Sequence, residues 1–301
     1  MTRGKGFSLV ELAVALAIIA LLLAGALIPL STQIDVRNGA DTQRGMESIR
    51  EAITGFAQAN GRLPCPANGS TAAGVAGAGT EQFNGTSCTA AFGVVPWATL
   101  GVSEVDAWGR RFSYRVAPAF ADAVSLTTWN ARLNAYSPPA GNLAQAVSSP
   151  TSPANQAPPC DLIVVPSSSS FALCSLGDIA VWTRGGATTN PVPLGTALPA
   201  VIISHGKNGF GAWQTTGVRL SPIPSGNDEA ANVNGNTTAT PSGGYSSLAF
   251  YSRTRAPAAA GCVDPVFPAT NAAPSCEFDD IVLMISSSAL ISRMVAAGRL
   301  P

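Results

Sequence analysis

The chain has few charged residues and a single histidine. Of its 301 residues 11% are charged, and 17 basic residues balance 17 acidic ones, so its formal net charge is zero. Nucleic-acid-binding proteins carry a strong positive field, so the composition points to no nucleic-acid partner. No Cys-x-x-Cys pair accompanies His205, which argues against a zinc site of the Cys/His type.

Charge is missing altogether from residues 12–33, most of which are Ala, Leu, Ile or Val. A helix needs about 20 apolar residues to cross a bilayer, so we predict a transmembrane helix over residues 7–30. Arg3 and Lys5 precede this run. Basic residues mark the cytoplasmic side, so the N-terminus is expected in the cytoplasm and the rest of the chain outside it.

One acidic residue, Glu11, lies at the start of this apolar run. A charge at mid-membrane costs at least about 2.5–3.5 kcal/mol on insertion scales. Glu11 is therefore expected either to have a partner or to lie at the level of the lipid headgroups, in contact with water.

The segment Gly6-Phe7-Ser8-Leu9-Val10-Glu11 resembles the N-terminus of type IV prepilins and of type II secretion pseudopilins. The resemblance implies that residues 1–6 are a leader, and that a prepilin peptidase cuts between Gly6 and Phe7 and N-methylates Phe7. It also implies assembly with other pilin or pseudopilin subunits, in which the Phe7 ammonium of one subunit pairs with Glu11 of its neighbour. Pro29 lies about one residue later than the proline usual in the family.

Two other interpretations of this N-terminus stay open. The first is an ordinary secretory signal peptide, for which Ala24-Gly25-Ala26 would be a passable cleavage site. The second is a plain membrane anchor. Neither of them explains Gly6 or Glu11.

Helical periodicity continues over residues 31–60. Met46, Ile49, Ile53 and Phe56 recur at three- and four-residue spacing, and Gly61 follows as a C-cap. We predict one long helix, bent at or near Pro29 with Gly39 as a second candidate position, whose apolar stripe packs on a sheet. The resemblance implies an α+β fold of the pilin type, in which this helix carries a β-rich head over residues 61–301 with an antiparallel sheet.

All six cysteines follow the apolar run, which in an oxidising compartment predicts disulfides. They fall into three sequential couples, although sequence alone allows fifteen pairings. The couples are Cys65–Cys88, Cys160–Cys174 and Cys262–Cys276.

The segment from Asp106 to Val116 resembles the Asp-Pro-Trp-Gly segment of major pseudopilins, with Ala107 where proline is usual. It predicts a turn, with Gly109 at positive φ, that leads into a strand with one buried face. A ligand site around Trp108 is the less favoured interpretation.

Further strands are predicted at 161–165, 179–182, 200–204 and 281–285, the last two central in the sheet, and a short helix at 289–297. Long loops or insertions are predicted at 137–159 and 221–245.

No catalytic site is predicted. His205 precedes a Gly-rich turn and is expected to hydrogen-bond locally, and no Gly-x-Ser-x-Gly elbow is present. No cofactor is expected, although the carboxylates Asp264, Glu277, Asp279 and Asp280 are weak calcium candidates. Lys207 and Arg253 are interpreted as solvated charges.

These observations predict a structural subunit, more specifically a minor one, of a type IV pilus or a type II secretion pseudopilus. The subunit is expected first in the bacterial inner membrane, with its head in the periplasm. It is then expected to enter the filament. An adhesin or substrate-recognition head on the same helix is the alternative, with contacts carried by the long loops. A membrane-anchored hydrolase that depends on His205 is a third and weaker hypothesis.

Overall fold

The computed structural model describes residues 8–123, 169–171, 177–184, 191–221, 226–234, 248–262, 264 and 276–300, without the side chains of residues 21–32, 119, 234 and 248. The chain divides into two units, Met1–Asp41 and Thr42–Pro301. The first unit consists, in its described part, of the start of helix α1, and the second holds the end of α1 and the head.

Helix α1 runs from Leu9 to Asn60, and its backbone stays helical through Pro29 and Gly39. Within the described part of the chain, no helix combines the length and the apolar character that a membrane crossing requires. The span predicted over residues 7–30 remains a prediction. Gly61 ends α1 with a φ of 72°, and its N–H donates to the carbonyl of Ala57 at 2.8 Å, as predicted for a C-cap.

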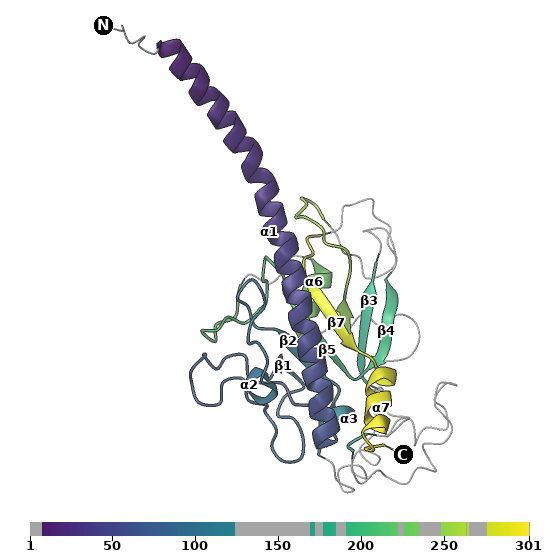
Figure 1. Ribbon diagram of the computed structural model, residues 1–301. Coiled ribbons are helices and arrows are strands. Elements are labelled where there is room, and N and C mark those ends of the chain that lie inside the picture. Colours follow the sequence, from purple (N-terminus) through teal and green to yellow (C-terminus); the bar gives the residue numbers. More distant parts are fainter. Residues whose placement is uncertain are drawn as a thin grey trace. The chain divides into compact units, whose positions relative to one another are not determined.

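The first sheet has the order β1-β2-β5-β7, and all its pairs are antiparallel (Figure 1). Its strands are β1 (Phe92–Val94), β2 (Ser113–Val116), β5 (Ala200–Ser204) and β7 (Ile281–Ile285). β5 is central and wholly buried, as its continuous apolar run predicted. β7 was expected to be central too, but it lies at the edge of the described sheet, and four of its five residues are only half-buried.

The second sheet has the order β4-β3-β6, with strands β3 (Ile179–Thr183), β4 (Val192–Leu198) and β6 (Leu248–Tyr251). β3 pairs antiparallel with β4 but parallel with β6. The predicted antiparallel sheet is confirmed by the first sheet, and the β3–β6 pair of the second sheet adds a parallel pairing that was not predicted. A parallel pair needs a long crossover, and here the intervening chain includes β4, β5 and helix α6 (Asn227–Asn234).

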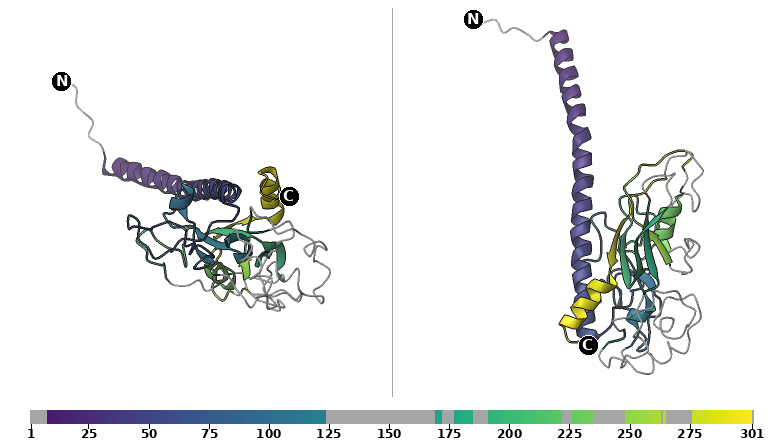
Figure 2. Two further views of the ribbon diagram at one scale, coloured as in Figure 1. Left: turned by 90° about the horizontal axis from the view of Figure 1, so that it is seen from below. Right: turned by 90° about the vertical axis from the view of Figure 1, so that its right-hand side faces the viewer.

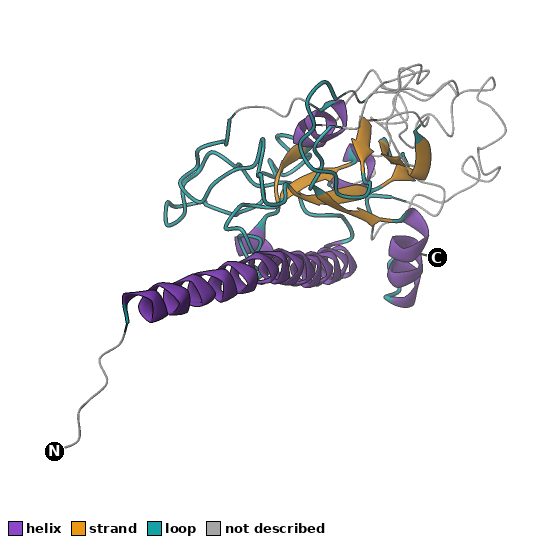
Figure 3. Ribbon diagram, turned by 90° about the horizontal axis from the view of Figure 1, so that it is seen from above, coloured by secondary structure: helices purple, strands orange, loops and turns teal. Residues whose placement is uncertain are grey.

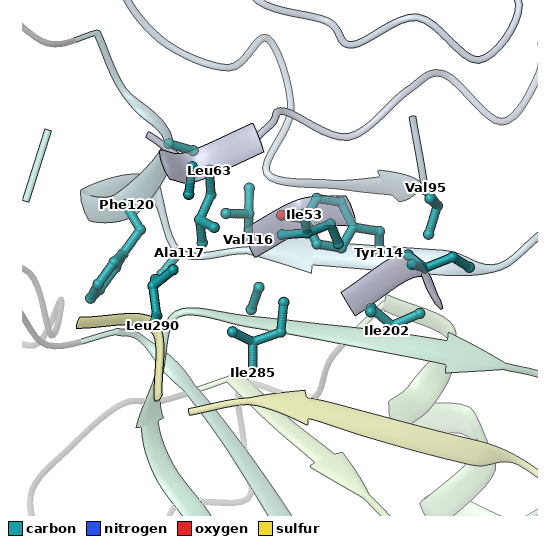
Figure 4. Close-up of a cluster of buried hydrophobic side chains, with 14 of the residues drawn as sticks. Ile53, Leu63, Val95, Tyr114, Val116, Ala117, Phe120, Ile202, Ile285 and Leu290 are labelled. Carbon is teal, nitrogen blue, oxygen red and sulfur yellow. The ribbon is translucent and has the colours of Figure 1, made fainter. Parts of the chain in front are cut away.

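The second unit is built in layers, because alternate side chains of each strand point to opposite faces of its sheet. Met46, Ile49 and Ile53 of α1 pack against Tyr114 and Ile202 on one face of the first sheet (Figure 4). The opposite face packs against the second sheet, whose far face is covered by α6. Figure 2 shows the end of α1 and α6 on opposite sides of the strands. The inter-sheet core includes Ile179, Val181, Val201, Ile203 and Phe250, and the core under α6 includes Ala180, Trp182, Ala231 and Phe278.

The predicted apolar stripe of α1 is confirmed for three of its four members. Met46, Ile49 and Ile53 are buried, but Phe56 is only half-buried and Ala57 takes the buried position. The residues of β2 differ from the prediction of one buried face, since Ser113 is buried together with Tyr114. The second sheet explains this difference, because it covers the face that was expected to meet solvent.

The remaining elements are short helices and loops. Loops occupy much of the head beside the strands (Figure 3). Helices α2 (Trp97–Leu100) and α3 (Pro118–Ala121) come before and after β2 in the chain, and α7 (Ser287–Ala296) is the predicted C-terminal helix. The stretch 221–245, predicted to be a loop, contains α6, whose first turn carries Asp228 and Glu229; acidic residues favour that position. The predicted strand at 161–165 and loop at 137–159 lie outside the described residues. The fold class is α+β, as predicted.

Candidate functional site

The N-terminal turn of α1 presents one carboxylate among apolar side chains. The backbone N–H of Ser8 donates to Glu11 Oε2 at 3.2 Å, and Ser8 Oγ accepts from the N–H of Val10 at 3.2 Å. Together these bonds form a capping arrangement that satisfies N–H groups left free at a helix start. Gly6 and Phe7 lie outside the described residues.

Apolar side chains around this cap are open to solvent. Leu9 is 87% exposed and Val10 70%, and further along the helix Leu12, Val14, Leu16, Ile18 and Ile19 are each more than half exposed. Apolar side chains gathered in this way indicate a surface that meets lipid or protein rather than water.

The Asp106 turn is built as predicted. Asp106 Oδ1 accepts from the N–H groups of Trp108 and Arg110 at 2.9 and 3.0 Å, and Gly109 has a φ of 78°. The other carboxylate oxygen accepts from Ser204 Oγ at 2.7 Å. The turn is thus bonded to the end of β5, which favours the structural interpretation of this motif.

His205 follows β5 and is completely buried. Its Nε2 lies 2.8 Å from Ser113 Oγ on β2, and its Nδ1 lies 3.7 Å from Asp280 Oδ1, just before β7. The expected local hydrogen bond is made by the backbone, since the carbonyl of His205 accepts from the N–H of Gly209 at 2.9 Å, whereas the pairing of β2, β5 and β7 brings distant residues beside the ring. Ser113 is 1% exposed and Asp280 6%, so this Ser-His-Asp arrangement is closed to a substrate.

Two of the four calcium candidates join a different acidic residue. Oxygens of Glu229, Asp279 and Asp280 all lie within 4.8 Å of one another. Burial, together with the negative charge of Asp280, raises the pKa of Glu229 to about 8. Burial likewise raises the pKa of Asp279, although a hydrogen bond from the backbone of Asn208 opposes the shift. Sequence reasoning missed Glu229, whose only signal was an acidic pair in a polar stretch.

Asp264 belongs to a separate network of buried charges. Arg253 Nη2 lies 3.3 Å from Asp264 Oδ1, and Arg253 Nε lies 3.1 Å from Asp228 Oδ2. Arg184 lies 2.7 Å from the other oxygen of Asp228. Burial and the charge of Asp264 raise the pKa of Asp228 to about 6, and the two arginines oppose this shift. The interpretation of Arg253 as a solvated charge was wrong. Glu277 is half-buried and outside both clusters.

The structure contains two of the three predicted cysteine couples. Cys65 is joined to Cys88, and Cys262 to Cys276. Arg253 also donates to the carbonyl of Cys276 at 2.8 Å, so the second disulfide holds one side of the Asp264 network. Cys160 and Cys174 lie outside the described residues.

Comparison with known proteins identifies the N-terminus. Residues 1–27 match the model of the prokaryotic N-terminal methylation motif, the prepilin-type cleavage and methylation signal. No curated protein matches the chain, and no solved structure does.

Proposed function

Because the chain carries a prepilin-type cleavage and methylation signal at residues 1–27, we propose that it is a structural subunit of a type IV pilus or a type II secretion pseudopilus. In this proposal a prepilin peptidase cuts after Gly6 and N-methylates Phe7. The signal is the observation that carries the proposal, and Glu11 among apolar residues supports it.

Assembly proceeds through the N-terminal helix. The exposed side chains of Leu9, Val10, Leu12 and Val14 are covered by lipid before assembly and by neighbouring helices within the filament. The Phe7 ammonium of one subunit pairs with Glu11 of the next. Two unit charges in contact attract by several kcal/mol at an intermediate dielectric, so the pair selects a correctly staggered neighbour.

The proposed location is the bacterial inner membrane, with the N-terminus cytoplasmic and the head in the periplasm. Arg3 and Lys5 before the apolar run support this orientation. The disulfides Cys65–Cys88 and Cys262–Cys276 support an oxidising compartment for the head.

We further propose a minor rather than a major subunit, and a structural role without catalysis. The size of the head, over residues 61–301, favours a component used in few copies. Burial of Ser113 and His205 leaves their side chains out of reach of a substrate, which disfavours a hydrolase that depends on His205.

The proposal is tested by shearing filaments from cells that express the tagged chain, in the presence and in the absence of the prepilin peptidase. We expect the chain in the filament fraction only when the peptidase is present. A chain that stays in the membrane fraction of peptidase-positive cells whose other subunits assemble would contradict the proposal.

A further inference from the structure

Three carboxylates meet where β5 ends, β7 begins and α6 passes over them. Glu229 comes from the first turn of α6, and Asp279 and Asp280 directly precede β7. Glu229 is 2% exposed and Asp280 6%, whereas Asp279 is half-buried. Like charges at this spacing in a dry environment repel strongly unless a bound proton or a positive charge compensates them.

Neutral groups hold the carboxylates in place. Asn208 donates to Glu229 Oε1 from its side chain at 3.1 Å and to Asp279 Oδ2 from its backbone at 2.7 Å. The side chain of Asn232 donates to Asp280 Oδ2 at 2.8 Å. These bonds orient the oxygens, but they supply no positive charge.

The ring of His205 lies beside one member of this cluster, Asp280. Its Nδ1 is buried and makes no hydrogen bond, and it lies 3.7 Å from Asp280 Oδ1. That separation is too long for a hydrogen bond. It is close to the ~3.4 Å that separates two ligands placed about 2.1 Å from one tetrahedral ion.

The hydrogen bond with Ser113 is compatible with the state of the ring that such an ion needs. Ser113 Oγ lies 2.8 Å from Nε2 of His205. When Nε2–H donates to this oxygen, the lone pair of Nδ1 points towards Asp280. Histidine ligands are commonly oriented by a hydrogen bond from their second ring nitrogen.

We propose that Glu229, Asp279 and Asp280, whose oxygens lie within 4.8 Å of one another, bind one divalent transition-metal ion at a site that His205 completes from the side of Asp280, and we call it the head metal site. Carboxylate oxygens with one imidazole nitrogen suit Zn²⁺ or Mn²⁺. Four protein ligands are typical of a structural site rather than a catalytic one. The ion joins α6 to the adjoining ends of β5 and β7, and it compensates the buried negative charge.

The test uses the full-length chain in detergent after removal of metals with a chelator. Titration with ZnCl₂, followed by calorimetry, is expected to give one saturable site and a rise in Tm. His205→Gln and Glu229→Gln should each weaken Zn²⁺ binding at least ~10-fold. The matched control is Glu277→Gln, which changes a half-buried acid of the same segment outside the cluster and should bind as the wild type does.

Glu229→Gln gives a second readout that does not depend on the fate of the His205 variant. Without metal it removes one of three crowded acids, so its Tm should exceed that of the metal-free wild type, while the rise on addition of Zn²⁺ is lost. Absence of saturable binding would overturn the site. So would equal binding by wild type and Glu229→Gln, or binding of Ca²⁺ that matches Zn²⁺ and is unchanged in His205→Gln.

Discussion

The carboxylate of Glu11 accepts a hydrogen bond from the backbone N–H of Ser8 at 3.2 Å, within the same chain. Before assembly, the one acid of the apolar run therefore already has a partner at its own helix start. Pairing with the Phe7 ammonium of a neighbouring subunit would have to compete with this bond. Glu11 can thus serve two roles in turn, first as part of a helix cap and then as a contact between subunits.

The two roles can be separated by two substitutions at one position. Glu11→Gln keeps an oxygen that can accept from the N–H of Ser8, but it removes the charge, whereas Glu11→Ala removes both. If charge pairing drives assembly, both variants should enter filaments at least ~10-fold less than the wild type, since ~1.4 kcal/mol already corresponds to that factor. Quantitative immunoblots of sheared filaments provide the measurement. Normal assembly of Glu11→Gln would show that capping, not charge, is what filaments require.

Ser8→Ala should weaken the cap without touching the charge of Glu11. The loss of Ser8 Oγ as an acceptor for the Val10 N–H should cost about 1 kcal/mol at the helix start. Faster hydrogen exchange of the first-turn amides in detergent would report this, with Ser8→Thr as the control that retains a hydroxyl. Identical exchange rates in the alanine and threonine variants would show that the hydroxyl does not contribute to the cap.

Arg111 is expected to matter far more to the head than its neighbour Arg110. Arg111 is completely buried, and it contacts Glu104 at 2.7 Å and the carbonyls of Gly69 and Thr71 at 2.8 and 2.7 Å. Arg111→Met leaves these groups without their cation and should destabilise the head by about 3–5 kcal/mol.

Arg110→Met is the matched control for this substitution. Arg110 donates one side-chain hydrogen bond, to the carbonyl of Gly206 at 3.0 Å, so its removal should cost only about 1 kcal/mol. Urea unfolding of the full-length variants in detergent compares the two. Equal losses of unfolding free energy would contradict the importance assigned to the Arg111 contacts.

The Cys65–Cys88 disulfide should stabilise the head measurably. It closes a loop with a sequence separation of 23 residues, and Cys65 is completely buried. The double variant Cys65→Ser with Cys88→Ser should lose about 2–4 kcal/mol, which lowers Tm by roughly 5–15 °C for a domain of this size. Thermal unfolding under non-reducing conditions measures the shift. An unchanged Tm would mean that this bond does not restrain the unfolded chain.

Local patterns predicted the local structure well. The apolar run Ala200–Ser204 became the central strand β5, the C-cap formed at Gly61, and Asp106 built its predicted turn. Each of these features depends on residues within a few positions of one another, where propensity and side-chain capping act directly.

Contacts between distant segments could not be predicted in this way. Glu229 meets Asp279 across 50 positions, and Ser113 meets His205 across 92. The register of β5 against β2 and β7 decides which polar side chains end beside His205, and nothing in one sequence specifies that register. Sequence reasoning therefore grouped Asp279 with the nearby Asp264, whereas the fold places Asp264 against Arg253.

Gly6→Ala should block maturation, because the resemblance places the peptidase cut directly after Gly6. The variant should keep its full-length mass when it is co-expressed with a prepilin peptidase, while the wild type becomes shorter by six residues. Gly4→Ala, a change in the same leader away from the cut, serves as the control and should be processed. Processing of Gly6→Ala at the wild-type rate would argue against the assigned site.

The N-terminus of the mature chain distinguishes a processed prepilin from an exported domain, and mass spectrometry of the N-terminal peptide from cells measures it directly. We expect a peptide that begins at an N-methylated Phe7 and retains Glu11 and the apolar run. A peptide that begins at Leu27, after removal of the whole run as an ordinary signal peptide, would contradict it.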